Sequence, residues 1–268
     1  MLRKRIIFTL IYENGFFNQS RNFRLQKVGG IDWLEKNYKF KEISIALDEL
    51  VVLNVARGEK NMFEFSKTLE KIVEDVFIPI SAGGGIRSIE DAELLFNSGA
   101  DKIVINTILV EDNDLVTRLV KKFGSQSIVA SVDYRCDEVF INNGTVKVDK
   151  NLEDHLENVE LLGVGEIYLN SIDKDGTGFG YDLKTVAKVI EKIKAPLIIA
   201  GGAGNEAHLA QGLNIDCINA VATANLFNFI GDSLVKSRER LLNDRYSLAF
   251  WDIEAASELK NSLINKKL

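Results

Sequence analysis

Short apolar runs alternate with amphipathic stretches along most of this chain. The runs are almost continuously hydrophobic, which is typical of strands that are buried on both faces, and the stretches between them show helical spacing of apolar residues. The predicted strands are Arg5–Ile11, Glu49–Asn54, Phe77–Ala82, Lys102–Asn106, Ser127–Asp133, Gly165–Asn170, Pro196–Ala200 and Cys217–Ala222. The predicted helices are Ile31–Leu47, Met62–Glu74, Ile89–Ser98, Asn113–Phe123, Leu152–Leu162, Leu183–Lys192, Glu206–Leu213 and Asp232–Leu241.

Eight strands that alternate with eight helices in 268 residues indicate an α/β fold, the (β/α)8 TIM barrel. We expect one barrel domain over residues 1–268, with a divergent helical extension from about 231 to 268. An open doubly wound sheet is the structural alternative. The first strand is not followed by a Gly-x-Gly-x-x-Gly turn, and this favours the barrel.

The chain also contains an internal echo. Pro79–Ile86 and Pro196–Ala203 each begin at one of the only two prolines and run through apolar residues into consecutive glycines, and Leu53-Asn54 is echoed by Leu169-Asn170 at nearly the same offset. The echo predicts a half-barrel duplication. Glycines leave their backbone N–H groups uncovered, and the helix that follows each turn would point its positive end at the same place, so both turns are candidate phosphate sites.

Two connections are longer than a barrel needs. Residues 13–30 are expected to form a long loop after the first strand. Residues 138–150 alternate polar and apolar side chains around Asn143-Gly144, which predicts a small hairpin over the rim of the barrel.

Candidate chemistry lies at the carboxyl ends of the strands, where barrel enzymes have their active sites. Asp133 ends an apolar strand there and is a candidate general acid or base; the alternative is a carboxylate that caps the following loop. The polar, glycine-rich stretch after Asn170 contains Asp175, Gly176 and Thr177, which could form a mobile ligand loop or an ordinary turn.

Composition narrows the class of protein. The net charge is −6 with both signs interspersed, which argues against a nucleic-acid partner, and no apolar run has the length of a membrane span or a signal peptide, so we expect a cytoplasmic protein. Cys136 and Cys217 lack metal-ligand spacing and are expected to be a loop thiol and a small buried residue. His155 and His208 fall within predicted helices, and neither a metal nor a cofactor is expected.

Several motifs together resemble one family. They are Met-Leu-x-Lys-Arg-Ile-Ile at the start, Asp48-Glu-Leu-Val51, Gly83-Gly-Gly-Ile-Arg87, Gly99-Ala-Asp-Lys102, Asn106-Thr107, Ser131-Val-Asp133, Ser171-Ile-Asp-Lys-Asp-Gly-Thr177, Gly180-Tyr-Asp182 and Gly201-Gly-Ala-Gly204. From residue 1 to about 230 the chain is thereby similar to HisF, the cyclase subunit of imidazole glycerol phosphate synthase. The resemblance implies a half-barrel duplication with two phosphate sites.

The resemblance also implies an ammonia route. The family takes ammonia from a HisH-like glutaminase docked at the amino-terminal face of the barrel, through a channel guarded by four charged residues. Those residues match Arg5, Glu49, Lys102 and Glu166, and Asp101 matches a residue of the glutaminase interface. A ring of this kind could instead be a salt-bridge plug that closes the base of the barrel.

The active face departs from the family pattern. Of its two catalytic aspartates, the second matches Asp133, whereas the first falls on Ile11, which cannot transfer a proton. Four further positions differ: where the family has a lysine, an aspartate, a threonine and a serine, this chain has Gln19, Asn54, Asn170 and Asn225, respectively. The implied substrate-binding and phosphate-binding residues are Gly84, Gly85, Asn106, Thr107, Asn170, Asp175, Gly176, Thr177, Gly201, Gly202, Ala224 and Asn225.

HisF-like paralogues encoded with surface-polysaccharide genes also lack the first aspartate, carry an apolar residue in its place and keep the ammonia-delivery residues. This chain resembles them at Ile11-Tyr-Glu-Asn-Gly15, where Ile11 stands at the position of the aspartate. The leading hypothesis is therefore a synthase subunit that receives ammonia for converting an acetamido sugar to an acetamidino sugar, together with a glutaminase and a separate amidotransferase. Its substrate would be a phosphorylated or nucleotide-linked small molecule. Two alternatives stay open: the authentic cyclase of histidine biosynthesis, and a non-catalytic scaffold that activates a glutaminase.

Overall fold

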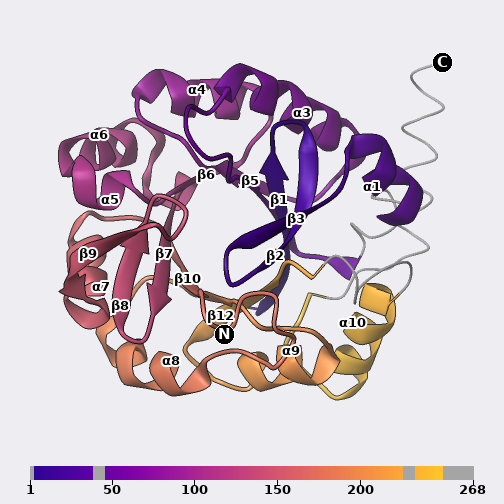
Figure 1. The fold of residues 1–268 in the computed structure, drawn as a ribbon. Helices are drawn as coiled ribbons and strands as arrows, with labels where there is room; N and C mark the ends of the chain where they lie inside the picture. Colours follow the sequence, from indigo (N-terminus) through magenta and orange to yellow (C-terminus); the bar gives the residue numbers. More distant parts are fainter. Residues whose placement is uncertain (1–2, 39–45, 226–232, 250–268) are drawn as a thin grey trace.

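The computed structural model describes residues 3–38, 46–225 and 233–249, and its centre is a closed barrel of eight parallel strands (Figure 1). Each strand of the barrel pairs with its neighbour on either side, and the last strand pairs with the first, which completes the ring. The closed ring confirms the predicted (β/α)8 barrel and rules out the open sheet. The strands are β1 (Arg5–Glu13), β4 (Glu49–Asn54), β5 (Ile80–Gly83), β6 (Lys102–Ile105), β7 (Ile128–Arg135), β10 (Glu166–Ser171), β11 (Leu197–Ala200) and β12 (Ile218–Thr223).

Helices surround the barrel and cover the outward side chains of its strands (Figure 1). Side-chain caps fix where several of them begin: Asn61, Ser88 and Asn205 each accept a hydrogen bond from a backbone N–H of the first turn. The helices are α1 (Ile31–Tyr38), α3 (Met62–Asp75), α4 (Ile89–Asn97), α5 (Ile108–Glu111), α6 (Asn113–Phe123), α7 (Leu152–Leu161), α8 (Leu183–Val189), α9 (Glu206–Leu213) and α10 (Ser233–Asn243). Short 3-10 turns, η2 (Ser125–Ser127) and η3 (Ile190–Lys192), supplement them.

Two hairpins rise from the mouth of the barrel. The predicted hairpin over residues 138–150 is confirmed as β8 (Glu138–Ile141) and β9 (Val146–Asn151), with Asn142, Asn143 and Gly144 at positive φ in its turn. The expectation of a loop over residues 13–30 was wrong, because β2 (Phe16–Arg21) and β3 (Arg24–Gly29) form a second hairpin on β1. Polar side chains dominate that segment and conceal its strand pattern.

Three smaller expectations need correction. The strand expected from Phe77 begins at Ile80, because Pro79 has no N–H to donate and Phe77 is 69% exposed. Cys217 is exposed rather than buried, since it lies in the turn before β12. Of the helix predicted over Ile31–Leu47, Ile31–Tyr38 is found as α1, residues 39–45 lie outside the described residues, and Ala46 and Leu47 are not α-helical.

Alternate side chains of the strands fill the interior of the barrel in layers. Arg5, Glu49, Lys102 and Glu166 form a charged layer at the amino ends of the strands. Beyond it lies an apolar cluster that is separate from the core beneath the helices. This inner cluster consists of Ile7, Val51, Val104, Val129, Tyr168, Ile198, Ala200, Ala220 and Ala222. It separates the base of the barrel from the mouth.

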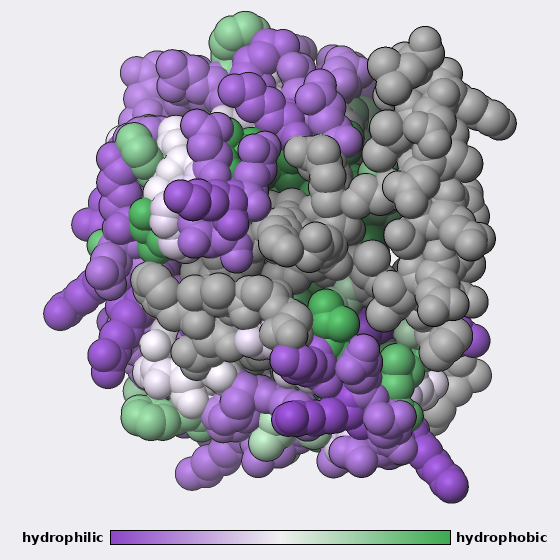
Figure 2. Space-filling view, turned by 90° about the vertical axis from the view of Figure 1, so that its right-hand side faces the viewer, coloured by the Kyte–Doolittle hydropathy of each residue, from purple (hydrophilic) through white to green (hydrophobic). Residues whose placement is uncertain are grey.

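The helix α10 is tied to the base of the barrel. Nη1 and Nη2 of buried Arg238 each lie 2.8 Å from a carboxylate oxygen of Asp48, and the Lys4 amide donates to the carbonyl of Ser247 at 2.8 Å. Residues 231–232 and 250–268 of the expected extension lie outside the described residues. Hydrophilic side chains dominate the coloured surface in Figure 2, and no helix of the described residues is long and apolar enough to cross a membrane.

Candidate active site

A cavity of about 490 Å³ opens at the carboxyl ends of the strands. It is lined by nearly all of the binding residues expected from the sequence: Gly84, Gly85, Asn106, Thr107, Asn170, Asp175, Gly176, Gly201, Gly202, Ala224 and Asn225. Thr177 does not line it, because its hydroxyl donates to the Lys174 carbonyl at 2.7 Å within the local turn. The structure therefore gathers these residues at one mouth, and their roles in binding stay predictions.

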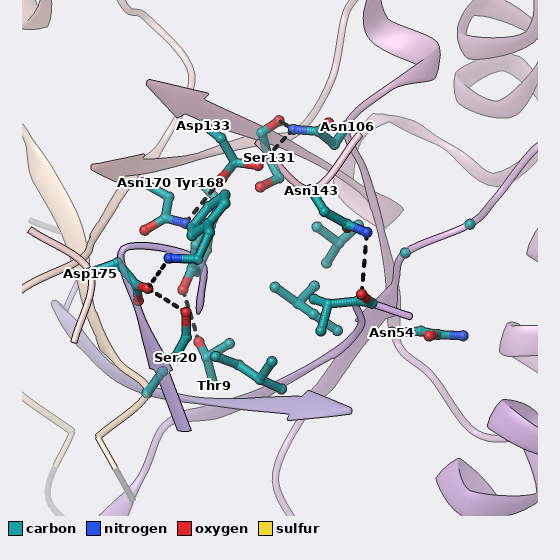
Figure 3. A pocket seen from close by; sticks show the side chains of 18 of the residues that line it. Thr9, Ser20, Asn54, Asn106, Ser131, Asp133, Asn143, Tyr168, Asn170 and Asp175 are labelled. Atoms are coloured by element: carbon teal, nitrogen blue, oxygen red, sulfur yellow. Dashed lines mark hydrogen bonds between the residues drawn. The ribbon is translucent and has the colours of Figure 1, made fainter. Parts of the chain in front are cut away.

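Asp133 is the central carboxylate of this mouth (Figure 3). One oxygen accepts from the Asn106 amide at 3.1 Å and the other from the Asn170 amide at 3.0 Å. Burial raises the pKa of Asp133 to about 7, although the hydrogen bond from Asn170 opposes the rise. Asp133 is thus held in place with a pKa near neutrality, which suits a group that accepts and returns a proton.

No second acid faces Asp133 from the opposite strand. In the ring of eight strands β1 lies across from β7, and there the cavity wall is Ile11, a hydrocarbon side chain only 8% exposed. The other buried carboxylate of the cavity is Asp175, whose pKa burial raises. Its Oδ2 accepts hydrogen bonds from the Ser20 hydroxyl and from the Phe23 amide, the latter at 3.1 Å, so Asp175 holds the β2–β3 hairpin (Figure 3).

The two hairpins close over the mouth reciprocally. The β2–β3 turn of the first half reaches the loop after β10 in the second half, where the Asn22 amide donates to the Asp175 carbonyl at 2.9 Å. The β8–β9 turn of the second half reaches the loop after β4 in the first half, where Asn143 Nδ2 donates to the Val55 carbonyl at 3.2 Å (Figure 3). Each half of the barrel therefore fastens the hairpin of the other.

The two glycine turns need glycine for conformation and for space. Gly84 and Gly202 have φ of 94° and 105°, and a Cβ on either would lie 2.1 Å from a carbonyl oxygen, that of Asn54 or of Gly180. The helices α4 and α9 begin a few residues later. Tight backbone beside a helix amino terminus is a suitable setting for an anion in each half.

The base of the barrel carries a closed ring of ion pairs. Arg5 lies 2.8 Å from Glu49 and 2.8 Å from Glu166, and Lys102 lies 3.0 Å from Glu49 and 3.1 Å from Glu166. Glu49 also accepts from the Ser81 hydroxyl. Each of the four charged side chains contacts two of opposite charge, an arrangement that suits an ammonia gate and a salt-bridge plug equally. Asp101, beside Lys102, is exposed and accepts a hydrogen bond from the Ile80 amide at 2.8 Å.

Sequence reasoning missed three features of the site. Thr9 and Tyr168 share a hydrogen bond of 2.9 Å on the cavity floor, and burial raises the pKa of Tyr168. Lys60 and Ser20 also line the cavity. Lys60 follows the carboxyl end of a strand, so position alone could have marked it, whereas nothing in the sequence marked Ser20. Within the described ranges, no three His, Cys, Asp or Glu side chains lie together as a metal site would require.

Comparison with known proteins gives a consistent result. The family model described as "Histidine biosynthesis protein" matches residues 31–231. A protein of Parasynechococcus marenigrum named "Putative imidazole glycerol phosphate synthase subunit hisF2" is 40% identical over 267 residues, which cover 98% of this chain and 99% of that protein. A protein of the same name in Pseudomonas aeruginosa is 35% identical, covering 86% and 93% of the two chains. Imidazole glycerol phosphate synthase subunit HisF of Chlorobium limicola is 36% identical, covering 91% and 98%.

Proposed function

The chain belongs to the histidine biosynthesis protein family, as a HisF-like enzyme subunit, and from that premise we propose that it passes ammonia from a partner glutaminase to the amidination of an acetamido sugar. In this proposal a HisH-like glutaminase docks at the base of the barrel, next to Asp101. A separate amidotransferase takes part in the conversion of the sugar, which carries a phosphate or a nucleotide. The product is an acetamidino sugar for a surface glycan.

One contrast carries the proposal: the base of the barrel keeps all four charged residues, whereas the mouth has lost an acid. The ring of Arg5, Glu49, Lys102 and Glu166 is complete. Asp133 at the mouth faces the hydrocarbon of Ile11 rather than a second carboxylate. Delivery of ammonia needs the charged ring. The missing acid is needed only for the cyclisation that uses two acids.

The interior suits a small neutral molecule. Above the charged ring, the wall of the barrel is apolar, and small side chains such as Ala200, Ala220 and Ala222 belong to it. Ammonium would lose its hydration there without a compensating partner, so the apolar layer favours ammonia over ammonium. Asp133 lies beyond this layer and is positioned to accept a proton from the nitrogen as it forms its new bond.

The test combines a glutaminase encoded beside this gene with the purified chain and the amidotransferase. Glutamine labelled with 15N in its amide is supplied together with excess unlabelled ammonium salt. Channelled ammonia would place the glutamine label in the amidino product despite the excess. A product labelled only in proportion to free ammonium, or a chain that does not bind the glutaminase, would count against the proposal.

A second candidate is the authentic cyclase of histidine biosynthesis. The identity to HisF of Chlorobium limicola over 91% of this chain favours it, as does Asp133 with its pKa of about 7. Histidine auxotrophy after deletion of the gene would support this candidate. A third candidate is a non-catalytic scaffold that activates a glutaminase. Full pathway activity of an Asp133→Asn variant would support it.

A further inference from the structure

Positive charge is distributed unevenly around the cavity. Among the described residues that line it, the basic side chains are Arg57, Lys60 and Arg87, and all three come from the loops after β4 and β5 in the first half. Arg57 is exposed, and Arg87 forms an ion pair of 2.8 Å with Glu111. Arg87 is exposed as well, whereas Lys60 is partly buried.

Contacts fix the position of Lys60 beside the first glycine turn. Its Nζ donates to the carbonyl oxygen of Asn54 at 2.7 Å, and Gly84 packs so tightly on the same oxygen that a Cβ there would lie 2.1 Å from it. The Cδ of Lys60 lies against Gly85, 2.7 Å from where a Cβ would stand. The ammonium group and the Gly84–Gly85 turn therefore meet at one atom.

No carboxylate of the described residues forms an ion pair with Lys60. Glu59 on its own loop and Asp91 on α4 line the same cavity, and Asp91 accepts from the Arg87 amide at 2.8 Å. Glu111 on α5 holds the Arg87 guanidinium. Burial and the charge of Arg87 lower the pKa of Lys60 to about 8. The positive ends of α3 and α4 begin beside it, after the caps Asn61 and Ser88.

We propose that Lys60 binds the phosphate or diphosphate end of the substrate at the Gly84–Gly85 turn, and that the substrate therefore lies with its most negative end toward β4 and β5. An ammonium group has three donors, and one of them is used by Asn54, so two are available to an anion. An anion there would also relieve the repulsion between Lys60 and Arg87. The identity of the substrate rests on the proposed function, whereas the role of Lys60 does not.

The test is an NMR titration of the whole chain with sulfate, which stays doubly charged across the pH range used. Amide signals of Gly84 and Gly85 report binding, and the 13Cε signal of Lys60 reports its protonation. We expect the pKa of Lys60 to rise when sulfate binds, and sulfate affinity to fall as pH rises through about 8. Lys60→Met should weaken binding roughly tenfold or more and abolish that pH dependence.

Two further variants complete the design. Lys60→Arg keeps the charge at all these pH values, so it should bind sulfate without the pH dependence near 8, and it confirms that the site still folds. Lys67→Met, on the exposed side of α3 where Lys67 pairs with Glu70 at 2.8 Å, should bind like the unmodified chain. The proposal is overturned if sulfate does not shift the glycine amides, if the pKa of Lys60 ignores sulfate, or if Lys60→Met binds sulfate normally. Failure of the ammonia proposal would appear in the isotope experiment and would leave this titration unchanged.

Discussion

Replacement of Asp133 by asparagine should stabilise the protein in alkaline solution. Burial raises the pKa of Asp133 from 3.8 to about 7 in the folded chain. Because the folded-state pKa is raised, the protonated carboxyl favours folding fully below the unfolded value, and this contribution is lost as pH rises through about 7. At 1.36 kcal/mol per pKa unit, ionised Asp133 costs about 4 kcal/mol of folding free energy above pH 8.

Asparagine removes that cost and fits the same space. Its oxygen accepts from Asn106, which is fixed by a second bond to the Ser131 carbonyl at 2.9 Å, and Asn170 can turn its amide to offer an oxygen to the new NH2 group. We expect Asp133→Asn to be close to neutral near pH 4 and to raise the melting temperature by about 10 °C near pH 8.5. Calorimetry or urea denaturation at several pH values measures the difference.

The control is Asp149→Asn on the exposed strand β9, which should shift stability equally little at every pH. If Asp133→Asn and the unmodified chain keep a constant difference in unfolding free energy between pH 4 and pH 8.5, the carboxylate is not held at a raised pKa. The interpretation of Asp133 as a proton-transfer group near neutral pH would then lose its physical basis.

Three further predictions concern the base, a glycine turn and the hairpins. Glu49→Gln leaves Arg5 and Lys102 to share Glu166, so the free energy of unfolding measured with urea should fall by about 3 kcal/mol. The control, exposed Glu70→Gln, should lower it by less than about 0.5 kcal/mol. A loss below about 1 kcal/mol for Glu49→Gln would contradict a tightly coupled ring. Gly202→Ala should lower the melting temperature, measured by calorimetry, more than Gly178→Ala does. Both glycines have positive φ, but only a Cβ at position 202 would lie 2.1 Å from a carbonyl oxygen. Equal losses would show that backbone strain is the whole effect. Ser20→Ala removes the hydrogen bond that the Ser20 hydroxyl donates to Asp175. Hydrogen exchange of the backbone amides in β2 and β3 should become roughly tenfold faster, while exchange in β8 and β9 stays unchanged. Unchanged exchange in β2 and β3 would mean that this bond does not fasten the hairpin.

Periodicity in the sequence was enough to predict the barrel. Each apolar run became a strand because both of its faces are buried, one by the helices and one by the interior of the barrel, so a strand such as Glu49–Asn54 could be bounded closely. The rule that carboxyl ends of strands share one face then gathered Asp133, Asn170 and the glycine turns correctly. The echo between the halves anticipated the matched glycine conformations at Gly84 and Gly202.

What the sequence could not supply were contacts between distant segments. The β2–β3 hairpin depends on tertiary bonds such as that between Ser20 and Asp175, and its exposed polar residues carry no apolar alternation to mark it. The position of Lys60 after a strand could have placed it at the mouth, but its fixed contacts arise only because Asn54, Gly84 and Gly85 fold against it. A lysine in a loop is otherwise typical of a solvated surface.

The most direct measurement for the central claim is a steady-state cyclase assay. The purified chain receives the substrate from which HisF-type enzymes make imidazole glycerol phosphate, with excess ammonium salt at mildly alkaline pH, beside an authentic HisF as reference. Free ammonia bypasses the glutaminase, so the assay tests only the mouth where Ile11 faces Asp133. We predict no turnover by the folded chain; turnover near the rate of the reference enzyme would contradict the amidination role and assign the chain to histidine biosynthesis.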